Sequence, residues 1–124
     1  MAPPDTKSVP KPVTWMGDSL QAVRSFPPAV RNEIGFALYQ VQTGYKHVNA
    51  KPLRGFGPGV LEVISDHRGD TFRAVYTVRL AGKVYVLHAF QKKSKSGIST
   101  PKADMELVKR RLKHAVELHA AQGD

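Results

Sequence analysis

The chain has 124 residues, of which 41% are hydrophobic and 23% are charged, and its formal net charge is +9. This size suits one globular domain with a single core, and because we find neither a membrane helix of roughly 20 apolar residues nor a secretory signal, we expect a cytoplasmic protein. The absence of cysteine excludes disulfides, a thiol nucleophile and cysteine-based zinc sites.

The first third of the chain predicts an irregular arm followed by a helical hairpin. Residues 1–12 contain four prolines and few large apolar side chains, so we expect a flexible arm there and one folded domain over 13–120. A short helix over 19–26 ends at Pro27, and Pro28 presets the first turn of a second helix. The apolar side chains at helical spacing in that second helix are Val30, Ile34, Ala37, Leu38, Val41 and Tyr45.

The middle of the chain changes to a period of two, which is typical of strands. Segments 60–67, 71–80 and 83–93 are rich in β-branched and aromatic residues, and the short "RGD" and "AG" stretches between them suit hairpin turns. They predict an antiparallel meander. Segments 13–15 and 51–56 are candidates for edge strands, so we expect a sheet of three to five strands.

The last segment predicts a helix that begins with Pro101 at its first position. Its apolar residues form one stripe that can dock on the sheet, and Lys102, Lys109 and Lys113 follow one flank of that stripe. The fold class we expect is therefore α+β, with an N-terminal helical hairpin, a sheet and a C-terminal helix. The stripe consists of Met105, Val108, Leu112, Ala115 and Val116.

Most of the excess positive charge lies in the last third of the chain. Between Lys83 and Lys113 there are nine basic residues against two acidic ones, Asp104 and Glu106, so the local balance is 9 − 2 = +7. Such a charge attracts polyanions, of which nucleic acid is the commonest in the cytoplasm. An ordinary solubilising surface is the alternative reading.

Common catalytic and cofactor motifs are missing from the sequence. The five histidines form no HExxH motif and no pair at i, i+4 on a predicted helix, so we expect no metal site. The "GFGPG" stretch at 55–59 lacks the lysine and following helix of a phosphate loop, and no GxSxG is present. We therefore expect no cofactor and no acyl transfer.

Cleavage of RNA without a metal needs only a few groups, because RNA supplies its own nucleophile in the 2′-hydroxyl. The protein must position that hydroxyl, accept its proton, stabilise charge on the phosphate and assist the leaving oxygen. Cations and one titratable group are enough for this chemistry.

The predicted strands supply such groups in register. Val84, Val86, His88, Phe90 and Lys92 would share one face under strict alternation, and a hairpin turn at "AG" would set Arg73 opposite residues 88–92. There His88 could exchange a proton near neutral pH, and Phe90 could stack on a base.

Each of these residues also has a structural reading. A strand histidine is more often a hydrogen-bonded structural residue than a catalyst, and Phe90 is more often core. Arg73 or Arg79 could instead pair with Glu62 or Asp66 on the neighbouring strand.

The order of elements and several motifs resemble the RelE/HigB superfamily of bacterial toxins, and most closely its phage-related HigB-like branch. The similarity covers roughly residues 13–115. A helical hairpin is followed by "KPLRGFGPGVLEV", "GDTFRAVYTV" and "VYVLHAFQKKSKSGISTPKADMELVKRRL", of which "LHAFQKKS" with "TPK" and a helix is the most specific part.

The resemblance implies a compact α+β fold with a curved antiparallel sheet. It also implies a toxin that cleaves mRNA on the translating ribosome, and an antitoxin from the same operon, often a helix-turn-helix, HigA-like protein. By motif match, Arg73 would stabilise the phosphate, while His88, Lys92 and Lys93 would transfer protons and clamp the substrate. The residues expected to hold messenger or ribosomal RNA are Lys51, Arg54, Phe90, Lys95 and Lys102.

Two other functions fit the same features. A ParE-like toxin would keep the fold and inhibit DNA gyrase without cutting RNA, and a non-catalytic RNA-binding module would use the same basic residues. The concentration of His88, Lys92 and Lys93 at one strand end favours chemistry.

Overall fold

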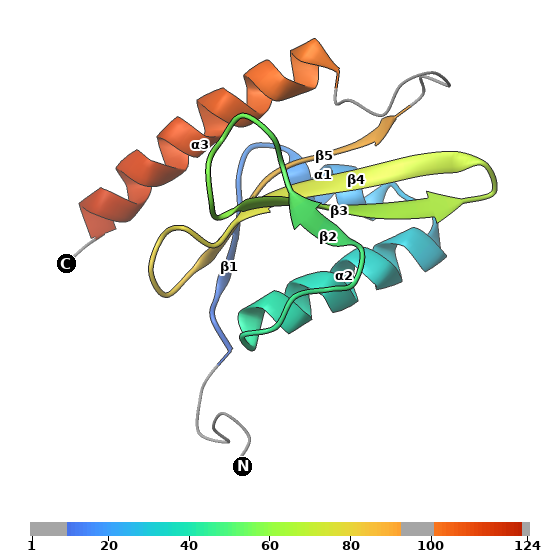
Figure 1. Cartoon of the computed structure of the whole chain (residues 1–124), viewed down its shortest axis with the longest axis horizontal. Coiled ribbons are helices and arrows are strands. Elements are labelled where there is room, and N and C mark those ends of the chain that lie inside the picture. The colour runs from blue at the N-terminus through green and yellow to red at the C-terminus, as the bar shows by residue number, and fades with distance from the viewer. Residues whose placement is uncertain (1–9, 93–100, 123–124) are drawn as a thin grey trace.

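The computed structural model describes residues 10–92 and 101–122 of the chain. An α+β fold is confirmed, with two helices before most of the sheet and one long helix after it (Figure 1). The predicted arm lies mostly outside the described residues. The elements are β1 (Val13–Trp15), α1 (Ser19–Arg24), α2 (Pro28–Gln42), β2 (Ala50–Pro52), β3 (Val60–His67), β4 (Asp70–Thr77), β5 (Val84–Lys92) and α3 (Lys102–Gln122).

The sheet has five strands in the order β1-β5-β4-β3-β2, so both candidate edge strands are present. The expectation of an antiparallel sheet was wrong at one edge, because β1 runs parallel to β5, with Val13 beside Val84. A parallel pair needs a long connection. The helical hairpin, β2 and the first two strands of the meander separate β1 from β5 and provide one.

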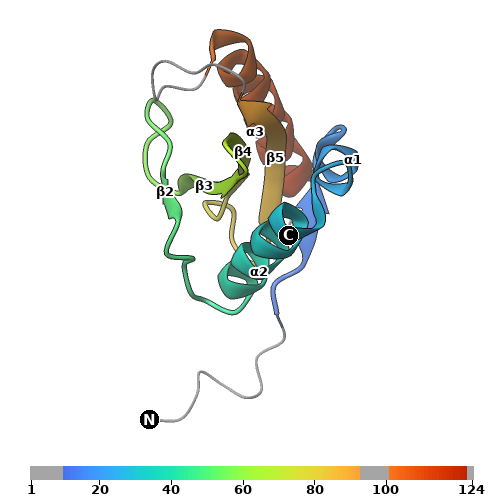
Figure 2. The same cartoon turned by 90° about the vertical axis from the view of Figure 1, so that its right-hand side faces the viewer.

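Helices cover both faces of the sheet. α1 packs on one face through Val23 and α2 through Ile34, and α3 packs on the other face through Val108 (Figures 1 and 2). Val116, predicted on the buried stripe of α3, is 41% exposed. No helix within the described residues is long and apolar enough to cross a membrane.

The connection from β4 to β5 is longer than the "AG" turn that we predicted. β4 ends at Thr77 because its hydroxyl donates to the carbonyl of Gly59 (2.7 Å) and accepts from the N–H of Arg79 (3.1 Å). Arg79 then donates through Nε to the carbonyl of Pro58 (3.1 Å). Residues 78–80 therefore bind the loop before β3 instead of extending the ladder.

A β-bulge in β5 changes which residues face α3. Val75 pairs with His88 but Tyr76 pairs with Val86, so Leu87 is an extra residue in the strand. The predicted common face was therefore wrong: Val84 and Val86 lie in the core under α1 and α2. Beyond the bulge, His88 shares the α3 side of the sheet with its partner Val75.

Candidate functional site

The α3 face of the sheet carries an ion pair between neighbouring strands. Arg73 of β4 donates through Nη1 to Oε1 of Glu62 on β3 at 3.0 Å, and both side chains are nearly covered, at 6% and 5% exposure. Lys51 of β2 stands directly opposite Glu62 in the register. The structural reading of Arg73 as a partner of Glu62 is thus confirmed. With Lys51 nearby, this part of the sheet still carries more cations than carboxylates.

Lys92 at the end of β5 is the second buried cation of this group. It pairs with Thr71 in the ladder and is 7% exposed. Burial lowers the pKa of the Lys92 ammonium, and the positive charges of Arg73 and Lys51 lower it further, while Glu62 acts in the opposite direction. Lys92 therefore releases its proton more readily than an exposed lysine. We call Lys51, Glu62, Arg73 and Lys92 the sheet cluster.

His88 is held by a carboxylate from the other side of the site. Its Nε2 lies 2.6 Å from Oδ1 of Asp104, which stands in the first turn of α3. Its Nδ1 is buried and has no hydrogen-bond partner among the described residues. A carboxylate oxygen accepts hydrogen bonds, so Nε2–H is the donor in this contact, and in the neutral ring Nδ1 then keeps its lone pair. This arrangement suits a proton acceptor.

The His88–Asp104 pair and the sheet cluster lie on the same face of the sheet. His88 stands opposite Val75, and Arg73 is two residues further along β4, opposite Phe90. Diagonal neighbours of this kind are about 7–8 Å apart. The prediction that Arg73 falls opposite residues 88–92 is confirmed. The cations of Arg73 and Lys92 therefore lie near the imidazole of His88 at one end of the meander.

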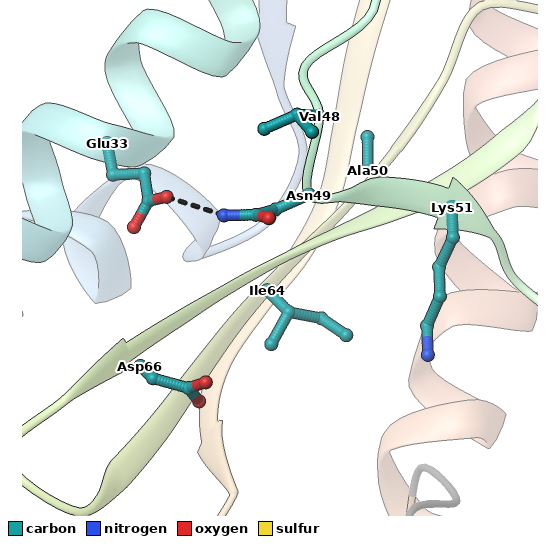
Figure 3. A pocket seen from close by; sticks show the side chains of 7 residues that line it. All are labelled: Glu33, Val48, Asn49, Ala50, Lys51, Ile64 and Asp66. Carbon is teal, nitrogen blue, oxygen red and sulfur yellow. Dashed lines mark hydrogen bonds between the residues drawn. The ribbon is translucent and has the colours of Figure 1, made fainter.

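An open hollow of about 460 Å³ adjoins the cluster at the β2 edge. Lys51, Ile64 and Asp66 contribute to its lining, and Figure 3 shows Lys51 and Glu33 on opposite sides of the hollow. This volume lies in the range of sites that bind small ligands. The described residues contain no group of three or more histidine, aspartate or glutamate side chains placed to hold a metal.

The remaining predicted site residues have different positions. Arg54 and Lys102 are exposed, in the turn after β2 and at the start of α3. Phe90 is only 9% exposed, and its ring stacks on His88 with centroids 5.0 Å apart. We therefore remove Phe90 from the residues proposed to stack on a base. Lys93 and Lys95 lie outside the described residues.

The sequence matches the family model "Phage derived protein Gp49-like (DUF891)" over residues 21–113, three quarters of the chain. The chain belongs to this family. The match confirms the predicted resemblance to the phage-related branch of the RelE/HigB-like toxins of toxin–antitoxin systems.

Comparison of the Gp49-like fold with solved structures gives a match to the toxin–antitoxin complex RelBE2 from Mycobacterium tuberculosis. The identity is 20%, the match covers 73% of this chain and 100% of that chain, and the TM-score is 0.47. A similarity this low transfers no residue role. No curated protein matches the sequence significantly.

Sequence reasoning missed Asp104 in this Gp49-like site. Asp104 entered only as one of two acidic residues in a basic segment, although it provides the partner of His88. Its place in the first turn of a predicted helix could have suggested a helix-start role. Its contact with His88 joins a strand to a helix across 16 positions of the chain, which no periodicity predicts.

Proposed function

We propose that this Gp49-like protein is the toxin of a toxin–antitoxin module and that it cleaves mRNA on the ribosome. The observation that supports this most is the position of two buried cations, Arg73 and Lys92, beside the His88–Asp104 pair on one sheet face. Buried cations and a histidine whose Nδ1 has no partner among the described residues are costly for stability and are typical of functional sites.

The cations of the sheet cluster would hold the scissile phosphate. During attack by the 2′-hydroxyl the phosphate gains negative charge, and a guanidinium in a partly dry site stabilises that charge more than water does. Glu62 keeps the Arg73 side chain in place through its hydrogen bond. Exposed Lys51, Arg54 and Lys102 would contact the RNA backbone around it.

His88 and Lys92 would carry the protons. Nδ1 of His88 accepts the proton of the 2′-hydroxyl as the 2′-oxygen bonds to phosphorus, and Asp104 steadies the ring through Nε2. The bond from phosphorus to the 5′-oxygen breaks, and Lys92, whose pKa is lowered, donates a proton to that oxygen. The products are a 2′,3′-cyclic phosphate and a 5′-hydroxyl.

The first test is inducible expression with mapping of mRNA 5′ ends during growth arrest. We expect new 5′-hydroxyl ends within translated regions for the wild type and their loss in Lys92→Met, which keeps the apolar stem of the side chain. Lys113→Met, an exposed lysine of α3, is the matched control and should cleave normally.

Arg73→Ala is a less decisive variant. It leaves the carboxylate of Glu62 buried without Arg73, which costs about 3–5 kcal/mol in comparable pairs, so loss of toxicity could follow from unfolding. Intact messages with DNA damage would instead indicate a gyrase inhibitor. No arrest and no cleavage in a translation extract would indicate an RNA-binding module.

A further inference from the structure

The outer face of α2 and the loop after it expose large apolar side chains. Phe36 is 55% exposed, Tyr39 56%, Tyr45 57% and Val48 89%. Tyr45, predicted on the buried stripe of the helix, lies beyond its end at Gln42. The helix α2 lies on the opposite side of the sheet from α3 (Figure 1). A cluster of this kind on a soluble domain marks an interaction surface.

Gly35 lies on the same exposed face, in the middle of α2. Glycine is the least favourable helix residue after proline, so a packing reason is expected for it. None exists within the described part of the chain, because a Cβ added at Gly35 would meet no atom within 4 Å. A bare backbone flanked by Phe36 and Tyr39 instead allows another helix to approach closely.

A hollow of about 190 Å³ lies beside the end of α2, with Tyr45 at its rim and Tyr76 of β4 in its lining. Tyr76 is 0% exposed, and its hydroxyl is buried without a hydrogen-bond partner among the described residues. Burial raises the pKa of Tyr76 to about 12, so the hydroxyl stays protonated at neutral pH. It is therefore a donor that lacks an acceptor.

The charges around this surface select the kind of acceptor. Lys11 and Lys46 line the same hollow, and Arg31 is exposed one turn before Gly35. The nearby carboxylate of Glu33 is already used, because it accepts hydrogen bonds from Asn49 and Ser65 at 2.8 and 2.6 Å. A carboxylate from a partner would pair with the lysines and accept a hydrogen bond from the buried tyrosine hydroxyl.

We propose that the outer face of α2 docks an acidic amphipathic helix of the antitoxin, with one carboxylate of that helix entering the hollow at Tyr76. The existence of an antitoxin rests on the proposed function. The bare Gly35 backbone favours a helix over RNA, since a base would stack on the aromatic rings without needing close approach at the glycine. A second copy of this basic surface would bring like charges together.

The test measures the dissociation constant between the full-length chain and the protein encoded by the neighbouring gene of its operon. We expect each of Tyr39→Ala, Lys46→Glu and Gly35→Gln to weaken binding about tenfold or more. The first removes an apolar contact, the second reverses a charge, and the third places a side chain where the partner helix would approach the backbone. The matched controls on α3, Val116→Ala and Lys113→Glu, should bind like the wild type.

Tyr76→Phe separates the docking role from a structural one. It removes only the hydroxyl, so we expect weaker binding by about tenfold without a lower melting temperature, because no intramolecular hydrogen bond is lost. A lower melting temperature with unchanged binding would overturn the hollow as a carboxylate site.

The remaining outcomes separate this inference from the proposed function. Growth arrest by the wild type together with unchanged binding in all surface variants would overturn the docking surface and leave the toxin function intact. Weakened binding in these variants with no growth arrest would support the docking surface and contradict the toxin function. Loss of RNA binding or of self-association, with antitoxin binding unchanged, would also overturn the docking surface.

Discussion

At the scale of single residues, the site is defined by charges that the fold holds out of water. Arg73 has Glu62 as a partner, whereas the charges around Lys92 act mainly against its protonated form. The sequence predicted Arg73, His88 and Lys92 as a group because strand alternation and residue type are visible in it. The degree of burial, and hence the lowered pKa of Lys92, follows from packing that a sequence does not show.

The lowered pKa of Lys92 predicts a specific dependence of stability on pH. Between its lowered value in the folded chain and its ordinary value near 10.5, the unfolded chain binds a proton that the folded chain does not, so stability rises with pH in that window. The free energy of unfolding of the wild type should therefore rise relative to Lys92→Met as pH increases from 7 to 11. Urea denaturation of both proteins measures this difference. Parallel curves across the whole range would show that Lys92 titrates alike in both states.

At the scale of elements, a bulge and a helix start together place His88. The guanidinium of Arg111 on α3 donates to the carbonyl of Leu87 (3.1 Å), the extra residue of the bulge, and to Asp18 (2.8 Å). Gly17 has φ +54°, which favours glycine, and a Cβ there would stand 2.5 Å from this guanidinium, so a substitution would be strained and would displace the end of the Arg111 side chain. Strict alternation could not predict the face of His88, because the bulge adds one residue to the strand and so reverses the alternation beyond it.

Asp104 belongs to this scale because it joins the first turn of α3 to β5. We expect Asp104→Asn to lower the rate of mRNA cleavage about tenfold or more, because an amide fixes the tautomer of His88 less well than a carboxylate. Nitrogen NMR of the imidazole should show a mixture of tautomers in the variant and one tautomer in the wild type. Glu106→Asn, on the exposed side of the same turn, is the control. A single tautomer with an unchanged rate would remove Asp104 from the site.

At the scale of the whole molecule, the two faces of the sheet have different proposed roles. The α3 face holds the sheet cluster and the His88–Asp104 pair, and the α2 side carries the exposed aromatic surface. Helix and strand periods predicted most of the fold. The helical spacing of apolar residues such as Ile34 and Leu38 in α2, and Val108 and Ala115 in α3, shows which face of each helix is buried. The parallel position of β1 beside β5 could not be predicted, because a strand of three residues carries too little pattern to choose its neighbour.

The most direct measurement uses purified chain, programmed ribosomes and a defined message, with the cleaved ends mapped by primer extension. The account predicts 5′-hydroxyl and 2′,3′-cyclic phosphate ends only when the message is on the ribosome. Cleavage should continue when a chelator that leaves ribosomes intact removes protein-bound metal ions, because the proposed chemistry uses no metal. The account also predicts that Lys92→Met and His88→Gln fold normally and fail to cleave. Wild-type protein that leaves the message intact, or variants that cleave at the wild-type rate, would contradict it.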